Sequence, residues 1–268
     1  MLTRAFKRAA LLAQDSAVFG LGAAKVLAAR VLGYETVKVR LHDVGTVLLR
    51  LNDSDYWSFQ QVFVTGIYEI SATPQGKRLQ SIYHRLLESG ITPVIIDAGA
   101  NVGAATLWFA NAFPKADIFA IEPEQSTFEV CCYNTASRPN VRVIQGAIGA
   151  RPGRAEVESA EVSWSARTSR AEHGDVAIYT VPDIFAMAGP NRVLLLVKVD
   201  IEGFEAEENT QWVSEAFAIY VEPHDWIFPG KKTSHSMKKS LFGIGFELLV
   251  QHENIMLVRP ESWNGIGS

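Results

Sequence analysis

From residue 93 onwards, the chain alternates between short apolar runs and longer segments with a helical pattern of apolar positions. Short runs rich in Val and Ile, bounded by polar residues or glycine, are typical of buried strands in a parallel sheet. Five runs of this kind occur, at residues 94–96, 118–121, 141–144, 193–200 and 217–221. Residues 246–251 and 255–258 flank Glu253-Asn254 and predict a terminal hairpin.

The first 90 residues follow a different pattern. Alternating apolar positions at 37–41 and 47–51 predict a β-hairpin, and helical patterns follow at 56–64 and 77–89. We expect residues 1–90 to form a helix, this hairpin and helices that pack over the ligand mouth of the following domain. Residues 91–268 would form that domain, with an insertion at about 149–192.

These elements together predict an α/β fold. It would be a Rossmann-like, seven-stranded, mostly parallel sheet with helices on both faces and a C-terminal antiparallel hairpin. A small N-terminal α+β extension would precede this sheet.

A glycine-rich turn follows the first of the five runs, with the spacing Asp97-x-Gly99-x-Asn101-x-Gly103. Glycines let the backbone turn sharply and approach a ligand, and the N–H groups of the following helix then point at that ligand. A dinucleotide-binding turn has the spacing G-x-G-x-x-G, which this turn lacks because Asn101 takes the second glycine position. Asp97 suits a ligand with an ammonium or sulfonium group better than one with a pyrophosphate, which an acid repels.

Glu122 ends the second run, 25 positions after Asp97. An acid near this offset accepts hydrogen bonds from ribose hydroxyls in nucleotide-binding sheets. The turn and the acid together predict a nucleoside-containing cofactor. A tight turn without a ligand and an ordinary acid at a strand end remain the structural alternatives.

Charged residues also mark the ends of the fourth and fifth runs. Lys198 and Asp200 would share one face of a strand, at the edge of the sheet where ligands bind. They predict a catalytic pair, or alternatively an ion pair that only fixes the strand end. His224 follows the next run and is suited to accept a hydroxyl proton near neutral pH. Asp200, Glu222 and His224 could instead bind one divalent cation such as Mg²⁺.

Composition narrows the class of partner. The net charge of −4 gives no support for binding to nucleic acid through overall positive charge. The adjacent cysteines Cys131 and Cys132 argue against a disulfide framework and favour a reducing, cytoplasmic location. Apolar runs near the N-terminus are interrupted by charges and are too short for stable membrane insertion. A packed N-terminal helix is the expected structure, with an amphipathic helix on a membrane or partner as the alternative.

The motifs in this order resemble the FkbM family of class I S-adenosylmethionine (SAM)-dependent methyltransferases. The resemblance is carried by five segments from residues 94 to 224, and by Ser54-Asp55 and Gly66-Ile67-Tyr68-Glu69 upstream. It covers about residues 37–258 and implies SAM as methyl donor and a hydroxyl acceptor on a natural product or sugar. The residues predicted to bind the cofactor, from the motifs and from this resemblance, are Glu69, Asp97, Gly99, Ala100, Asn101, Gly103, Glu122, Pro123, Gly146, Ala147 and Asp200.

We therefore expect a SAM-dependent O-methyltransferase acting on a small hydroxylated molecule, with His224, Asp200 and Lys198 as candidate catalytic residues. Two alternatives are an NAD-dependent oxidoreductase on the same fold and a non-catalytic protein that binds SAM or a nucleoside. Asn101 argues against the first, and the intact Asp97, Gly99, Gly103 and Glu122 argue against the second. The acceptor, the need for a metal and a homo-oligomeric state stay open.

Overall fold

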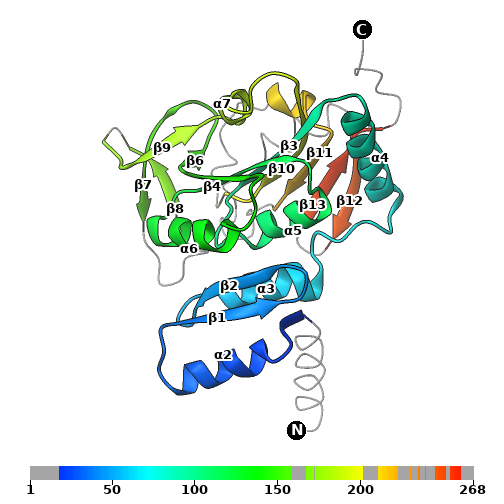
Figure 1. Ribbon diagram of the computed structural model, residues 1–268. Helices are drawn as coiled ribbons and strands as arrows, with labels where there is room; N and C mark the ends of the chain where they lie inside the picture. Colours follow the sequence, from blue (N-terminus) through cyan, green and yellow to red (C-terminus); the bar gives the residue numbers. More distant parts are fainter. Residues whose placement is uncertain are drawn as a thin grey trace.

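The computed structural model describes residues 18–158, 167–171, 173–201, 211–222, 230, 235, 239, 245–251 and 254–260. Its centre is a seven-stranded sheet with the order β12-β13-β11-β10-β3-β4-β5 (Figure 1). These strands span Thr92–Ala98 (β3), Asp117–Glu122 (β4), Val141–Gln145 (β5), Arg192–Val199 (β10), Ala218–Val221 (β11), Glu247–Gln251 (β12) and Asn254–Val258 (β13). β3, β4, β5, β10 and β11 run parallel, and β13 pairs antiparallel with both β11 and β12. The predicted fold class is confirmed.

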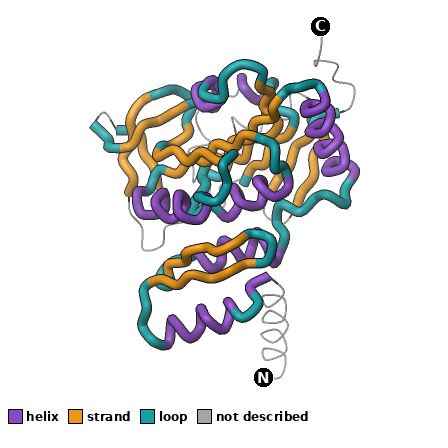
Figure 2. The backbone as a smooth tube through the Cα atoms, viewed as in Figure 1, coloured by secondary structure: helices purple, strands orange, loops and turns teal. Residues whose placement is uncertain are grey.

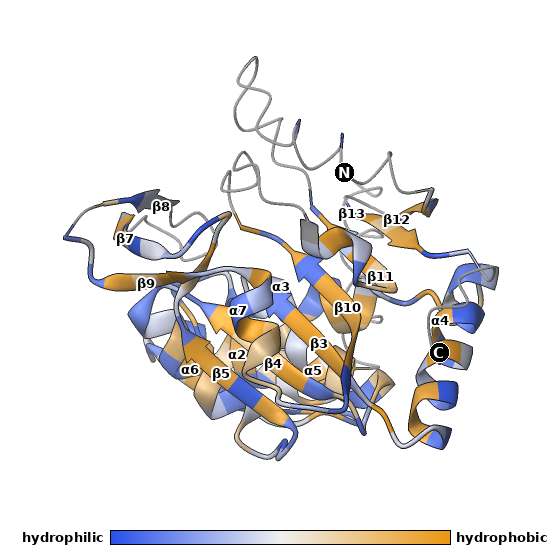
Figure 3. Cartoon of the chain, turned by 90° about the horizontal axis from the view of Figure 1, so that it is seen from above, coloured by the Kyte–Doolittle hydropathy of each residue, from blue (hydrophilic) through white to orange (hydrophobic). Residues whose placement is uncertain are grey.

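Two apolar cores cover the two faces of this sheet. On one face, Ile95 and Leu196 pack with α4 (Pro74–Glu88) and α5 (Ala104–Ala112), beside which lies α6 (Gln125–Thr135). On the other face, the side chains that alternate with these along the strands, such as those of Val94 and Ile96, pack with α7 (Val181–Ala186) and the short helix η4 (Gln211–Ser214). Figure 3 shows β3, β4 and β10 hydrophobic over most of their length. Burial on both faces explains why these strands read as unbroken apolar runs.

The N-terminal unit lies against the outer side of α5 and α6 (Figure 2). It contains α2 (Gly22–Val31), the hairpin β1 (Thr36–Leu41) and β2 (Gly45–Arg50), α3 (Asp55–Phe59) and η1 (Gln60–Thr65). Alternate residues of β1 are buried, as the sequence pattern requires. β2 contacts α6, so the hairpin lies between α2 and the helices that cover the sheet.

A second, four-stranded sheet with the order β6-β9-β7-β8 lies between β5 and β10 in the sequence. Its strands span Ala147–Ile148 (β6), Gly153–Glu158 (β7), Arg167–Arg170 (β8) and Val176–Tyr179 (β9). β6 starts two residues after β5 ends, so this sheet begins beside the carboxyl end of the central strands. Within the described residues, no helix is both long and apolar enough to cross a lipid bilayer.

Candidate functional site

The glycine turn after β3 is held in a backbone conformation that most residues avoid. Gly99, Asn101 and Gly103 have φ of 81°, 49° and 85°, all in the left-handed region. A Cβ on Gly99 would lie 1.8 Å from the carbonyl oxygen of Asp200, so no larger residue fits there. The N–H groups of Gly99 and Ala100 both donate to the carbonyl of Ile121, at 3.0 and 2.9 Å, which fixes the turn against β4.

An ion cluster centred on Lys198 lies directly beneath this turn. The Lys198 ammonium lies 3.1 Å from Oδ1 of Asp97 and 3.3 Å from Oδ2 of Asp200, and it donates to the carbonyl of Gly99 at 2.8 Å. Thr106 donates to the other carboxylate oxygen of Asp97 at 2.6 Å. Oδ1 of Asp97 is within ion-pair distance of the ammonium but has no hydrogen-bond partner among the described residues.

The charge on Lys198 is stabilised by this cluster. Burial by itself lowers the pKa of the ammonium, but the carboxylates of Asp97 and Asp200 outweigh burial and hold that pKa well above its usual value. Lys198 therefore stays protonated at neutral pH and cannot accept a proton from a substrate. Its geometry is that of a residue that positions Asp97, Asp200 and the turn.

Asp97 is completely buried, and both of its oxygens face groups of the protein. Direct contact between Asp97 and a cofactor stays a prediction. What the structure shows is that Asp97 holds the base of the turn through Thr106 and Lys198.

Glu122 connects the end of β4 to the turn. Its Oε2 accepts from the backbone N–H of Asn101 at 2.9 Å, and its Oε1 accepts from that of Glu124 at 3.0 Å. Burial raises the pKa of this carboxyl to about 7, although both N–H groups favour the ionised form. The sequence-predicted acid and turn are thus in direct contact, in the arrangement expected of a nucleoside-binding pair.

Asn101 presents an acceptor at the same place. Its Nδ2 lies 3.5 Å from Oγ of Ser58 on α3, whereas its Oδ1 is buried and has no hydrogen-bond partner among the described residues. Buried polar atoms are rarely left unpaired, and each unpaired atom needs an explanation, such as a bound water, ion or ligand. The turn therefore offers a hydrogen-bond acceptor next to Glu122.

The segment after β5 forms the next wall of the site. The N–H of Gly146 donates to the carbonyl of Glu122 at 3.2 Å. A Cβ on Gly146 would lie 2.7 Å from the ring of Tyr179, so a larger residue would force this ring to shift. Ala147 is buried in β6, and Pro123 is half-buried beside Glu122. The structure thus brings Gly146, Glu122 and the turn together at neighbouring strand ends.

Asp200 and Glu222 follow the adjacent strands β10 and β11. The N–H of Asp200 donates to Ala98 and that of Glu222 donates to Val199, both at 3.1 Å. The Asp200 side chain is 28% exposed, unlike Asp97 and Lys198, which are 0% and 4% exposed. His224 lies outside the described residues. Within the described residues, no three His, Cys, Asp or Glu side chains are grouped as a metal site, so the predicted cation site stays a prediction.

Glu69 is exposed, and its Oε1 accepts from the N–H of Ser71 at 2.8 Å. This hydrogen bond does not test the predicted contact between Glu69 and the amino-acid end of SAM, which stays a prediction. The preceding residue, Tyr68, is buried and lies near the ion cluster instead. Its ring contacts Trp108, Phe109 and Tyr220 at centroid distances of 6.0, 5.4 and 5.3 Å.

Burial raises the pKa of the Tyr68 phenol well above its usual value, and the charges of Lys198, Asp200, Asp97 and Glu222 also act on this phenol. The sequence analysis assigned no role to Tyr68, although it lies within Gly66-Ile67-Tyr68-Glu69. That motif was the available signal. The family resemblance implies a ligand contact for Glu69 and gives no role to Tyr68.

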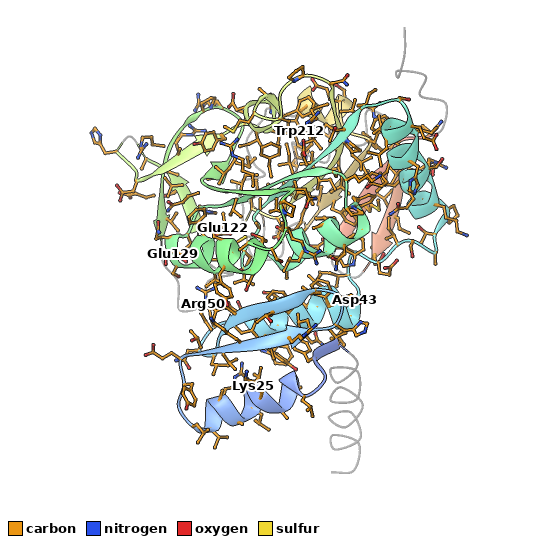
Figure 4. The ribbon with its side chains drawn as sticks, viewed as in Figure 1. Lys25, Asp43, Arg50, Glu122, Glu129 and Trp212 are labelled. Atoms are coloured by element: carbon orange, nitrogen blue, oxygen red, sulfur yellow. The ribbon has the colours of Figure 1, made fainter. Side chains whose placement is uncertain are left out.

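Hydrogen bonds connect the N-terminal unit to the end of the central sheet that carries the glycine turn. Arg50 pairs with the buried Asp55 at 2.8 Å and donates to Oγ of Ser126, at the start of α6, at 3.0 Å. Figure 4 shows Arg50 on the hairpin below Glu122 and Glu129. Asn134 donates to the carbonyl of Val102 in the turn at 2.9 Å and accepts from the N–H of Leu48 at 2.7 Å. The hairpin is thereby connected to the turn itself.

The strand order, the glycine turn and its contact with Glu122 define a Rossmann-like nucleotide-cofactor protein of the methyltransferase type. Residues 97–208 match the methyltransferase FkbM domain. This part of the chain is similar to the FkbM methyltransferases, and the match supports a SAM-dependent methyltransferase.

No curated protein matches the sequence significantly. Solved structures with similar folds include the O-methyltransferase TomG from Streptomyces achromogenes in complex with SAM, which is involved in tomaymycin synthesis. It is 12% identical with a TM-score of 0.40, and the match covers 76% of this chain and 89% of that one. Fibrillarin from Aeropyrum pernix with natively bound SAM is 11% identical, with a TM-score of 0.37 and coverage of 84% and 93%. Precorrin-6y C5,15-methyltransferase from Geobacter metallireducens is 14% identical, with a TM-score of 0.35 and coverage of 67% and 86%.

Proposed function

We propose that this methyltransferase transfers the methyl group of SAM to a hydroxyl oxygen of a small natural product or sugar. The observation that carries the proposal is the position of Asp200. It is the one member of the Lys198 cluster with a substantially exposed side chain, and its carbonyl lies against the cofactor turn. A hydroxyl bound beside Asp200 would lie at the carboxyl edge of the sheet, where ligands bind in such folds.

The residues around the turn fit SAM. Glu122 would accept hydrogen bonds from the ribose hydroxyls, and Oδ1 of Asn101 would gain the partner that it lacks within the described residues. Gly99, Ala100 and Gly103 would allow close approach of the cofactor, while Pro123, Gly146 and Ala147 would line its other side. When bound, SAM supplies a methyl group that the positive sulfonium already activates.

Because the methyl group is already activated, the protein mainly aligns the acceptor and excludes water. Asp200 would accept a hydrogen bond from the acceptor hydroxyl and so orient its oxygen. The hydroxyl proton would pass to His224 or to Asp200 itself. Lys198 stays protonated and holds Asp200 in place.

We propose further that the reaction needs no divalent cation. The Lys198 ammonium lies 3.3 Å from Oδ2 of Asp200 and shares its single positive charge between that carboxylate and Asp97. A divalent cation on the same carboxylate would be repelled by this ammonium. Full activity after exhaustive chelation would support this, and loss of activity that Mg²⁺ restores would contradict it.

Calorimetric titration with SAM, with its demethylated product S-adenosylhomocysteine and with NAD tests the cofactor first. The proposal requires binding of the first two and no binding of NAD. A panel of hydroxylated acceptors is then incubated with the protein and SAM, and the carbon chemical shift of the transferred methyl identifies the atom that carries it. A methyl on nitrogen or carbon would overturn O-methylation.

Three variants separate the catalytic roles. Asp200→Asn and His224→Ala are each expected to lower kcat, and His224→Ala should leave SAM affinity unchanged. Asp117→Asn is the matched control, because Asp117 pairs with Arg192 at the opposite end of the central strands. Normal turnover in both of the first two variants would refute the assignment of Asp200 and His224.

A further inference from the structure

The N-terminal unit contains a pocket of about 670 Å³ at the end of the hairpin that carries Arg50. This volume is within the usual range for small-molecule sites. The lining side chains that could contact a ligand are Arg30, Tyr34, Asn52, Asp53, Ser54 and Trp57. None of them has a place in the cofactor site described above.

Two aromatic side chains in this lining are unusually exposed. Tyr34 is 61% exposed and Trp57 is 57% exposed, although large aromatic side chains are normally well buried. Exposed aromatic rings grouped around a hollow are typical of a surface that a ligand covers. Their faces would pack against the C–H groups of a ring, while the phenol and indole N–H stay available for hydrogen bonds.

The polar side chains of the pocket are arranged before any ligand binds. Oδ1 of Asp53 accepts from the backbone N–H of Ser54 at 2.7 Å and from its Oγ at 3.2 Å. Oδ2 of Asp53 lies 3.4 Å from the guanidinium of Arg50. The exposed amide of Asn52, on the preceding residue, offers two donors and one acceptor. Fixed polar groups of this kind give hydrogen-bond specificity at little entropic cost.

The charges of the lining argue for a neutral ligand. Arg30 would repel a cation such as a quaternary ammonium, for which exposed aromatic rings are otherwise suited. Asp53 would disfavour a phosphate or a carboxylate beside it, and its ion pair with Arg50 reduces this repulsion. A neutral ring with apolar faces and hydroxyl groups at its edge matches both the aromatic and the polar side chains.

Arg50 connects this pocket to the cofactor end of the sheet. Its guanidinium lies 3.4 Å from Asp53 in the pocket and donates to Ser126 at the start of α6 at 3.0 Å. On the same unit, Ser58 follows Trp57 directly and lies 3.5 Å from the amide of Asn101 in the turn. A ligand in the pocket is therefore adjacent to elements that contact the cofactor turn.

We infer that this pocket is a binding site for a neutral sugar ring, and that this ring is part of the methyl acceptor. The second half of the inference rests on the proposed function. The ring in the pocket would hold the acceptor at a distance from the hydroxyl that is methylated, as an anchoring subsite.

Direct binding tests the inference without turnover. The full chain is titrated, by calorimetry and saturation-transfer NMR, with methyl glucoside, methyl galactoside, methyl rhamnoside and maltose, and in parallel with glucose 1-phosphate and choline. The inference requires saturable binding of at least one neutral saccharide. Trp57→Ala and Asn52→Ala should weaken it at least about tenfold, and Trp57→Phe should retain most of it.

Tyr133→Ala is the matched control, because Tyr133 is an exposed aromatic residue on α6 that does not line the pocket. It should bind the saccharides as the unchanged protein does. The inference is overturned if no neutral saccharide binds, if glucose 1-phosphate or choline binds in their place, or if Trp57→Ala binds as before. Titration of the same samples with SAM separates the two proposals: SAM binding without saccharide binding refutes the sugar site alone, whereas saccharide binding without SAM binding refutes the proposed cofactor site.

Discussion

The ammonium nitrogen of Lys198 lies 3.1 Å from Oδ1 of Asp97, and the two residues face each other in the register of strands β10 and β3. Both side chains are buried, at 4% and 0% exposure. The neighbouring residues of both strands are apolar and buried, so this pair is held where charges are costly unless they are paired. The third charge, Asp200, extends the pair toward the surface at the edge of the cofactor turn.

Replacement of Lys198 with Met should therefore destabilise the protein strongly. The variant leaves Asp97 buried without its cation, and the expected loss is about 3–5 kcal/mol of unfolding free energy. Urea denaturation measures this loss. Arg192→Met is the control, because its pair with Asp117 is partly exposed and should contribute at most about 1 kcal/mol.

The double variant Lys198→Met with Asp97→Asn should recover part of the lost stability, because it removes the uncompensated charge. A single Lys198 variant as stable as the Arg192 control would show that the buried pair does not matter for folding.

Replacement of Gly99 with Ala should disrupt the turn. The added Cβ would meet the Asp200 carbonyl oxygen at 1.8 Å, and the positive φ adds backbone strain. We expect a loss above about 3 kcal/mol, or loss of SAM binding in a folded protein. Gly90→Ala is the control: Gly90 has a φ of 71° but nothing within 4 Å of the added atom, so only the strain of about 1 kcal/mol applies. Equal effects of the two variants would show that the contact with Asp200 is not critical.

The parts of the site that follow local rules could be predicted from the sequence. An apolar run predicts a strand, the glycine spacing predicts a turn, and an acid 25 positions later lies at the next strand end. The contact of Glu122 with Asn101 confirms that these two motifs meet. Lys198 and Asp200 were expected to share a face, and they form an ion pair.

Contacts between distant segments could not be predicted in this way. The pairing of Lys198 with Asp97 depends on the register of two strands about 100 residues apart, which no local pattern encodes. The link from Asn134 to Leu48 depends on which face of α6 meets the hairpin. Tyr68 was missed for the same reason, since only the packing of its ring against α5 and β11 brings it to the ion cluster.

The raised pKa of Glu122 gives SAM binding a defined pH dependence. Ribose hydroxyls donate to the ionised carboxylate, so the cofactor favours the deprotonated form of a group whose pKa is about 7. SAM affinity should rise with pH and be about tenfold weaker at pH 6 than well above pH 7. Calorimetry in buffers of different ionisation enthalpy should show proton release on binding. Glu122→Gln should remove the pH dependence; if the variant keeps it, another group is responsible.

The same pKa predicts the opposite trend for the stability of the protein without cofactor. Between the usual value of 4.5 and about 7, the folded protein holds a proton on Glu122 that the unfolded chain has lost. The contribution of Glu122 to the unfolding free energy therefore falls as pH rises through this window, by about 3 kcal/mol at most. The difference in unfolding free energy between the unchanged protein and Glu122→Gln, measured at pH 5 to 8, should follow this fall. A difference that stays constant or increases with pH would contradict it.

Asn134 should couple the hairpin to the cofactor turn. Its side chain accepts from the N–H of Leu48 at 2.7 Å and donates to the carbonyl of Val102 at 2.9 Å, and it is buried. Asn134→Ala leaves these two backbone groups without their partner, so we expect a loss of about 2–3 kcal/mol in urea denaturation and weaker SAM binding. Asn140→Ala is the control, because within the described residues the Asn140 amide donates to the carbonyl of Ala116, away from the turn. This variant should lower stability by about 1 kcal/mol with unchanged SAM affinity. If Asn134→Ala loses stability but binds SAM as tightly as the control, the hairpin stabilises the fold without positioning the turn, and the coupling is refuted.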